Sequence, residues 1–298
     1  MGRKREVVDR YRFTSGRTFR LSDVDPSDTG GLTSKTRAQR ELARGIERLS
    51  ALQERLYAQD LWAVLLVFQA MDAAGKDGTI KHVMSGINPQ GCQVHAFKSP
   101  SAEELDHDFL WRCAVRLPER GRIGIFNRSY YEEVLVVRVH PELLDRERLL
   151  DALRGPGLWQ QRYEDINAFE RHLSRNGTRV LKFFLHVSRG EQRERFLERL
   201  DTPDKRWKFS AADVAERGHW GEYQKAYEEM ITATATEDAP WYVVPADRKW
   251  FARYVVAEVV ISELERLRLA FPKVGAAQEK ELKRLRAALV AEKGSRKG

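Results

Sequence analysis

The sequence predicts an α/β protein built on a parallel, five-stranded sheet that is sandwiched between helices. Five short apolar runs, rich in β-branched and aromatic residues, are typical of strands buried on both faces of such a sheet. Longer charged segments with helical spacing separate the runs, as in alternating strand and helix units. No internal repeat or linker divides the chain, which predicts one main domain. The expected strands are 61–70, 93–97, 122–126, 179–187 and 240–246.

The remaining segments define the expected domain organisation. Residues 1–34 show no sustained period and are expected to form an extended N-terminal arm. The domain itself spans 35–270 and opens with an amphipathic helix over 35–59, where apolar residues recur three or four positions apart. Residues 188–231 contain no strand candidate and predict a helical lid over the sheet. Residues 271–298 predict a charged, solvated C-terminal helix and tail.

Charge and hydropathy limit the partners and the location of the protein. The chain contains 52 Lys and Arg against 44 Asp and Glu, a net charge of +8, which favours a polyanion such as nucleic acid, a nucleotide or a phosphate chain. No apolar run approaches the roughly 18–20 residues that cross a bilayer, and the first residues lack the apolar centre of a signal peptide. We therefore expect a cytoplasmic protein with no membrane partner. Cys92 and Cys113 lack His partners at metal-ligand spacing and predict neither a disulfide framework nor zinc.

A candidate phosphate loop, residues 69–79, follows the first apolar run and leads into a helical pattern. Its sequence, QAMDAAGKDGT, joins small residues to a Gly-Lys pair. In this arrangement backbone N–H groups and a helix N-terminus surround phosphate oxygens while the lysine neutralises them. Ala74, Gly75 and Lys76 are therefore predicted to bind phosphate, with Lys76 acting in catalysis. The alternative is an ordinary tight turn between strand and helix.

The phosphate loop differs in two places from the usual G-x-x-x-x-G-K-[ST] pattern. Ala70 stands where the first glycine belongs, and Asp77 replaces the Ser or Thr that would hold magnesium. Asp72 is the expected substitute, because Mg²⁺ prefers carboxylate oxygens and can bridge them to phosphate. Lys81, at the start of the following helix, could add a second positive charge toward a longer phosphate chain.

A second candidate group follows the apolar run at 122–126. Asn127 stands where a neighbouring strand usually supplies an acid for the metal, so Glu132 or Glu133 would have to provide the carboxylate. We prefer Glu133, acting directly or through a metal-bound water. Arg128 would pair with phosphate oxygens through its planar guanidinium group. The alternative is a solvated helix start capped by a serine.

The predicted lid supplies a third candidate group of cations. Mobile positive charges that close over a transferring phosphoryl group would stabilise its transition state and exclude water. The same segment holds many acids, so an ion-paired surface helix explains the arginines about as well. The predicted phosphate-binding residues of the lid are Arg189, Arg193, Lys205 and Lys208.

Three kinds of function therefore stay open from the residues alone. A phosphate-transferring enzyme and an ATP-dependent nucleoside monophosphate kinase would both use this loop and lid. A basic nucleic-acid-binding module would explain the charge without catalysis. Because the sequence has no helix-turn-helix, zinc-finger or RNP-like pattern, we expect no nucleic-acid partner.

Four segments, in order along the chain, resemble the polyphosphate kinase 2 family and in particular its class III branch. They are QAMDAAGKDGTIKHVMSGINPQGCQV, FKSPSAEELDHDFLWR, GRIGIFNRSYYEEVLVVRVHP and DTPDKRWKFS. By position, Asp72 and Lys76 look like the family's loop aspartate and lysine, and Arg128 like the arginine that follows its second acidic position. Asn127 departs from the Asp common in the family but is similar to the class III pattern.

This resemblance implies more than the residues do. The family has a P-loop fold related to thymidylate kinase, an α-helical lid and a dependence on Mg²⁺. Its members transfer phosphate from inorganic polyphosphate to nucleotides, and the class III branch is associated with both AMP and ADP as acceptors, which gives ADP and ATP. Family members are commonly oligomers, so we expect a homo-oligomer.

Overall fold

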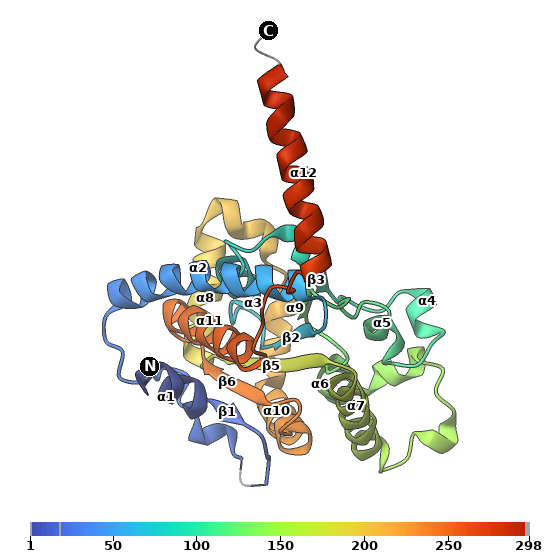
Figure 1. Cartoon of the computed structure of the whole chain (residues 1–298). Coiled ribbons are helices and arrows are strands. Elements are labelled where there is room, and N and C mark those ends of the chain that lie inside the picture. Colours follow the sequence, from blue (N-terminus) through green and yellow to red (C-terminus); the bar gives the residue numbers. More distant parts are fainter. Residues whose placement is uncertain (1, 18, 296–298) are drawn as a thin grey trace.

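The computed structural model describes residues 2–17 and 19–295 and has an α/β fold around a mixed sheet of six strands (Figure 1). The order across the sheet is β1-β6-β5-β2-β4-β3. The strands are β1 (Arg12–Phe13), β2 (Ala63–Gln69), β3 (Cys92–Ala96), β4 (Ile123–Asn127), β5 (Thr178–His186) and β6 (Trp241–Pro245).

The sheet corrects the predicted fold class. The five expected strands are present within two residues of their predicted bounds, and they pair in parallel. The sixth strand, β1, pairs antiparallel with β6 through Arg12 opposite Tyr242 and Phe13 opposite Trp241. The prediction of a purely parallel, five-stranded sheet was therefore wrong, because a strand of two residues leaves no periodic pattern in the sequence.

Helices cover both faces of the sheet (Figure 1). Helices α2, α3 and α1 pack against α11 in one layer, while α6, α7 and α10 pack together in the other. The helices are α1 (Gly2–Arg10), α2 (Lys35–Gln59), α3 (Lys76–Val83), α4 (Ala102–Leu105), α5 (Trp111–Ala114), α6 (Glu132–Val139), α7 (Leu158–Arg175), α8 (Arg189–Asp201), α9 (Ala211–Glu216), α10 (Trp220–Thr234), α11 (Lys249–Arg266) and α12 (Ala276–Ser295).

Both ends of the chain carry helices. The N-terminal segment is not simply extended, since α1 buries Val7 and Val8 and packs on α11. At the other end α12 projects from the body, and its described side chains are exposed (Figure 1). Within the described residues, no helix is long and apolar enough to span a bilayer.

The centre of the sheet is the core, which fixes where the candidate site lies. Every residue of β2 is buried, and the rings of Phe68 and Phe183 stack with their centroids 4.9 Å apart. Since β2, β4, β5 and β6 run parallel, their carboxyl ends meet at one edge. Ligands of open α/β sheets bind outside this edge.

Candidate active site

The phosphate loop joins the end of β2 to the start of α3 at this edge. Ala73 and Gly75 have φ values of 61° and 102°, so two residues of one short loop lie in the left-handed region. Such turns create concave backbone surfaces that attract anions, and here the N-terminus of an eight-residue helix follows directly. The side chain of Lys76 folds back over the loop, and its Nζ donates to the Ala70 carbonyl at 2.7 Å.

The pKa of Lys76 depends on its burial and on the charged side chains near it. Burial, followed by the nearby positive charge of Arg128, lowers the pKa of Lys76 to about 8. The carboxylates of Asp72 and Glu132 oppose this shift. An incoming phosphate would favour the charged form further, because an opposite charge at close range stabilises an ammonium group.

Arg128 connects the phosphate loop to the segment after β4. Its guanidinium group donates to Asp72 Oδ1 at 3.0 Å and lies 3.4 Å from Glu132 Oε2. Gln69 Nε2 donates to the other Glu132 oxygen at 2.8 Å. The Glu132 carboxylate, followed by Asp72, raises the pKa of Arg128 against the effect of burial. The structure thus places Asp72, Lys76 and Arg128 close together, and of the two acids that the sequence left open it places Glu132 beside them.

Asn127 has a role that the sequence did not reveal. Its Nδ2 donates to Asp77 Oδ1 at 2.7 Å, which connects the end of β4 to the first turn of α3. An aspartate at 127 would place two carboxylates at hydrogen-bond distance, so Asn127 and Asp77, each a departure from the expected residue at its position, compensate each other. This pairing joins residues 50 positions apart and has no local signal.

Glu133 lies on a different side of α6 from Glu132. Its Oε2 is 3.5 Å from Arg162 Nη1 on α7, and it is buried. Burial, followed by the Glu147 carboxylate, raises the pKa of Glu133 to about 8. Consecutive helical residues point about 100° apart, which explains why Glu132 reaches Arg128 and Glu133 does not. The preference for Glu133 as the metal carboxylate gains no support from this geometry.

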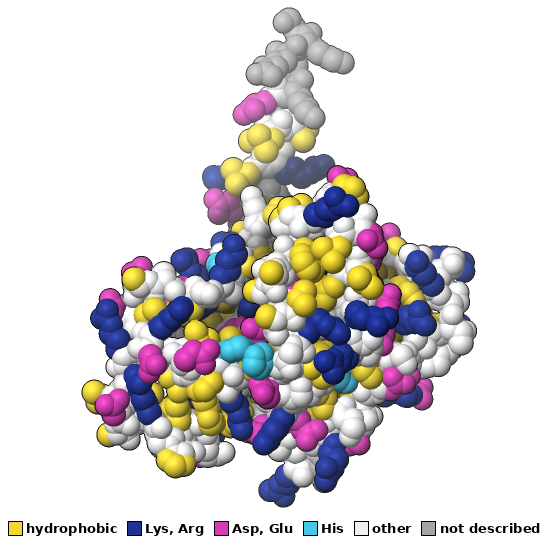
Figure 2. All heavy atoms as spheres, turned by 180° about the vertical axis from the view of Figure 1, so that it is seen from behind, with side chains coloured by type: hydrophobic (Ala, Val, Ile, Leu, Met, Phe, Trp, Pro, Cys, Tyr) yellow, Lys and Arg dark blue, Asp and Glu magenta, His cyan; other side chains and the backbone are white. Residues whose placement is uncertain are grey.

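Two of the four cations predicted in the lid form surface ion pairs in this structure. Arg193 pairs with Glu194 at 2.8 Å and Lys205 with Glu198 at 2.5 Å. Arg189 begins α8, where its carbonyl accepts from Arg217. Lys81 on α3 is exposed, and the Lys208 side chain lies outside the described parts of the structure. On the face seen in Figure 2, basic side chains alternate with acidic ones rather than forming one basic surface.

Arg195 on α8 was missed at the sequence level. Its buried Nη1 donates to the carbonyls of Ala73 and Ala74 at 3.0 and 2.8 Å, and its Nη2 to those of Ala246 and Asp247. Nε donates to Glu191 at 2.8 Å, so all five guanidinium hydrogens are used. Arg195 therefore holds the phosphate loop against α8 and the end of β6. In the sequence Arg195 was one of four lid arginines that include i,i+4 pairs, and this spacing did not distinguish it from arginines on the surface.

A cavity adjoins this group on the side of α6. Its volume is about 490 Å³, and its wall includes both Arg128 and Glu132. The wall also carries aromatic rings, Phe97 and Phe109, beside basic side chains such as Arg112. Pockets with apolar walls and a few convergent polar groups are typical of small-ligand sites.

The donor set is compatible with magnesium. Among the described residues, no three or more His, Cys, Asp and Glu side chains form a group that could hold a metal alone. Asp72 and Glu132 are both partly exposed carboxylates that share one arginine. Mg²⁺ is usually held by one or two carboxylates together with substrate phosphates, which these two side chains fit.

A lysine, an arginine and two carboxylates thus lie close together beside a strand-loop-helix turn. This arrangement is typical of phosphoryl-transfer enzymes. Comparison with known proteins agrees and is more specific. The model of the polyphosphate kinase 2 (PPK2) family matches residues 32–271, and the chain belongs to this family.

Individual relatives cover nearly the full chain. An ADP-polyphosphate phosphotransferase of Rhodopseudomonas palustris is 56% identical over 86% of this chain and 89% of its own length. An AMP/ADP-polyphosphate phosphotransferase of Meiothermus ruber is 46% identical over 92% of this chain and 98% of its own. The crystal structure of polyphosphate kinase 2 from Arthrobacter aurescens TC1 has a TM-score of 0.84 at 41% identity, covering 93% of this chain and 95% of that one.

Proposed function

We propose that this protein transfers phosphoryl groups from inorganic polyphosphate to AMP and ADP, giving ADP and ATP, with Mg²⁺ as its cofactor. The observation that carries the proposal is the contact of Arg128 with Asp72 and Glu132, directly beside Lys76 and the phosphate loop. Relatives in Rhodopseudomonas palustris and Meiothermus ruber, named for polyphosphate transfer with ADP or with AMP and ADP, support the choice of donor and acceptors.

The acceptor nucleotide occupies the 490 Å³ cavity, with its terminal phosphate beside Arg128. The aromatic rings of Phe97 and Phe109 supply apolar walls for the base and ribose, while Arg128 binds and orients the phosphate oxygens. An oxygen of that phosphate attacks the terminal phosphoryl group of polyphosphate in line with the leaving oxygen. In this scheme the site accelerates the reaction mainly by positioning the acceptor phosphate relative to the phosphoryl group that it attacks.

The polyphosphate chain lies on the other side of the reacting group, over the phosphate loop. Ala74 and Gly75 contribute backbone groups there, and Lys76 neutralises charge that develops on the transferred group. Lys81 and the lid residues Arg189, Arg193, Lys205 and Lys208 bind the remainder of the chain. In this scheme each surface ion pair of the lid exchanges its carboxylate for a phosphate.

Asp72 and Glu132 hold the magnesium ion in the proposed site, which revises the initial preference for Glu133. Bound by these two carboxylates, Mg²⁺ would supply positive charge that neutralises part of the charge of the phosphates. Arg128 already connects the two carboxylates, so it keeps both side chains oriented before substrates arrive.

Four finer assignments accompany the proposal. The chain has the P-loop kinase fold related to thymidylate kinase, and the Asn127 pattern places it in the class III branch of the family. The lid comprises 189–219, since Tyr227 and Met230 of α10 are buried in the main core. The protein is a cytoplasmic homo-oligomer.

The test is product formation by the purified protein. With Mg²⁺ and polyphosphate, AMP should yield ADP and then ATP, and ADP should yield ATP directly. A parallel reaction with ATP as donor and AMP as acceptor measures the competing activity of a nucleoside monophosphate kinase. No product from polyphosphate, combined with fast transfer from ATP, would overturn the donor assignment.

A further inference from the structure

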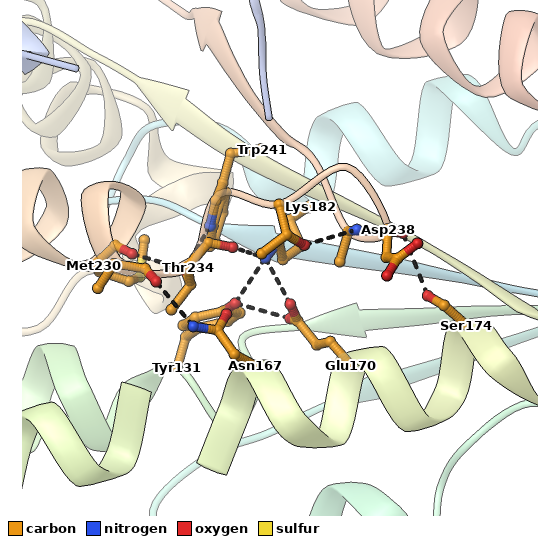
Figure 3. A network of polar contacts seen from close by, with 12 residues as sticks. Tyr131, Asn167, Glu170, Ser174, Lys182, Met230, Thr234, Asp238 and Trp241 are labelled. Atoms are coloured by element: carbon orange, nitrogen blue, oxygen red, sulfur yellow. Dashed lines mark hydrogen bonds and ion pairs between the residues drawn. The ribbon is translucent and has the colours of Figure 1, made fainter. Parts of the chain in front are cut away.

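A closed group of polar side chains lies beneath the candidate site, in the helical layer of α6, α7 and α10. Figure 3 shows Lys182 of β5 at its centre, with Glu170 of α7 and Tyr131 beside it. The Lys182 Nζ donates to Glu170 Oε2 at 2.6 Å, to the Tyr131 hydroxyl at 3.0 Å and to the Thr234 carbonyl at 2.7 Å. Lys182 has no exposed surface, and Glu170 is 1% exposed.

This group uses its hydrogen-bonding capacity completely around the lysine. The three hydrogens of the ammonium group have three acceptors, each from a different element. The second Glu170 oxygen accepts from the hydroxyls of both Tyr130 and Tyr131 at 2.8 Å. No donor is left for a ligand, so this group is not a second binding site.

The two tyrosines connect the buried group to the site. They immediately precede Glu132 and follow Arg128 by two and three positions, in the turn between β4 and α6. Arg128 itself has a φ of 65°, a conformation that residues with a side chain rarely adopt. Such a backbone persists only when its surroundings hold it in place. On one side the Arg128 N–H donates to the Phe68 carbonyl at 3.0 Å, and on the other the tyrosine hydroxyls are fixed by Glu170.

A purely packing role does not account for charges at this position. Replacing a buried ion pair with apolar side chains of similar volume is often neutral or stabilising. An apolar cluster could not fix the directions of the two tyrosine hydroxyls. Only hydrogen bonds to a defined acceptor oxygen set the direction of an O–H group.

We propose that Glu170 and Lys182 are positioning residues: through the hydroxyls of Tyr130 and Tyr131 they hold the Arg128 turn, and thereby the guanidinium group and the Glu132 carboxylate, in the geometry that binds the acceptor phosphate. This inference rests on the proposed function for the identity of the acceptor. It assigns Lys182 and Glu170 no contact with substrate.

The first experiment compares Tyr131→Phe with Tyr242→Phe. Tyr242 of β6 is also fully buried, and its hydroxyl donates to a buried carboxylate, Glu263, at 2.9 Å. Tyr131→Phe loses the buried hydrogen bonds to Glu170 and from Lys182, and Tyr242→Phe loses the one to Glu263, so both should lower the unfolding temperature. We expect only Tyr131→Phe to lower kcat with ADP, by about tenfold, because a small misplacement of a phosphate-binding group is costly. Equal kinetic effects in the two variants would overturn the proposal.

A double-mutant cycle tests whether the effect passes through Arg128. In an Arg128→Ala background, Tyr131→Phe should change kcat by less than about twofold, because the group being positioned is gone. An undiminished tenfold loss in that background would show that Tyr131 acts elsewhere. The conservative variant Glu170→Gln, which keeps an acceptor oxygen for the tyrosines, should retain more activity than Glu170→Ala.

Equilibrium binding of ADP, measured by calorimetry, separates this inference from the proposed function. Tyr131→Phe should weaken ADP binding several-fold and Tyr242→Phe should leave it unchanged. If the wild-type protein fails to use polyphosphate but shows this difference in ADP affinity, the donor assignment fails and the positioning role stands. If both variants bind ADP like the wild type, the positioning role fails whatever the donor is.

Discussion

Two clusters of this protein contain both lysine and carboxylate side chains, and they differ in how many of their polar groups are exposed or lack a partner. Around Lys76 the charges are partly exposed, and Arg128 contacts two acids that also border a cavity. Around Lys182 every ammonium hydrogen has a buried acceptor. In the proposed function the first, open cluster binds phosphate and metal, whereas the second, closed cluster only holds its neighbours in place. The same pairing of residue types therefore serves binding or positioning, depending on access to solvent.

The largest effect should come from removing the lysine charge of the closed cluster. In Lys182→Met the Glu170 charge stays buried without its partner, which should lower the free energy of unfolding by about 3–5 kcal/mol. The matched control is Arg193→Met, which removes an exposed ion pair with Glu194 and should change stability by about 0–1 kcal/mol. Urea unfolding measures both. Similar losses of stability in the two variants would contradict the view that the buried Lys182–Glu170 pair matters more for folding than an exposed ion pair.

The open cluster should respond in rate rather than in stability. Lys76→Ala and Asp72→Asn should each lower kcat by at least about 100-fold, because each removes a charge that acts on the reacting phosphates. Circular dichroism should show the wild-type fold, since both side chains lie at the partly exposed edge of the sheet. A near-wild-type rate in a folded variant would remove that residue from the site.

The dependence of the rate on Mg²⁺ should distinguish Glu132 of the open cluster from the adjacent Glu133. Glu132→Gln should raise the Mg²⁺ concentration for half-maximal rate by about tenfold, because a metal held by one fewer anion binds less tightly. Glu133→Gln should shift it by less than about twofold, since Glu133 contacts Arg162 instead of Asp72. Magnesium titrations of the rate measure both variants. The reverse pattern would restore the original preference for Glu133, and unchanged curves for both would leave the metal to Asp72 and the phosphates.

The sequence predicted the parts of this molecule that have a local pattern. Continuous apolar runs located five strands, and the loop that follows the first of them located Asp72 and Lys76. The strand β1 has only two residues, and the roles of Arg195 and Asn127 depend on partners 51 or 50 positions away or farther. The spacing of residues in the sequence also could not show whether Glu132 or Glu133 of α6 faces the site. The two tyrosines directly before α6 donate hydrogen bonds to Glu170, which lies about 40 positions along the chain.

The smallest expected effect concerns Glu133, which adjoins the open cluster but is buried like the closed one. Burial raises the pKa of Glu133 from its ordinary value of 4.5 to about 8, so the folded protein keeps a proton that the unfolded chain releases. The resulting stabilisation is complete below pH 4.5 and is lost as the pH rises through about 8. Gln cannot ionise, so Glu133→Gln should escape this loss.

The unfolding temperature of Glu133→Gln, relative to the wild type, should therefore rise by a few °C between pH 5 and pH 8.5. Differential scanning calorimetry across this range measures the difference. Glu142→Gln, at a largely exposed carboxylate, is the control and should follow the wild-type curve. If the curves for Glu133→Gln and the wild type stay parallel, Glu133 is ionised in the folded protein at neutral pH. Its burial beside Arg162 would then resemble the balanced pairing of the closed cluster, and the acid that remains available to metal in the open cluster would still be Glu132.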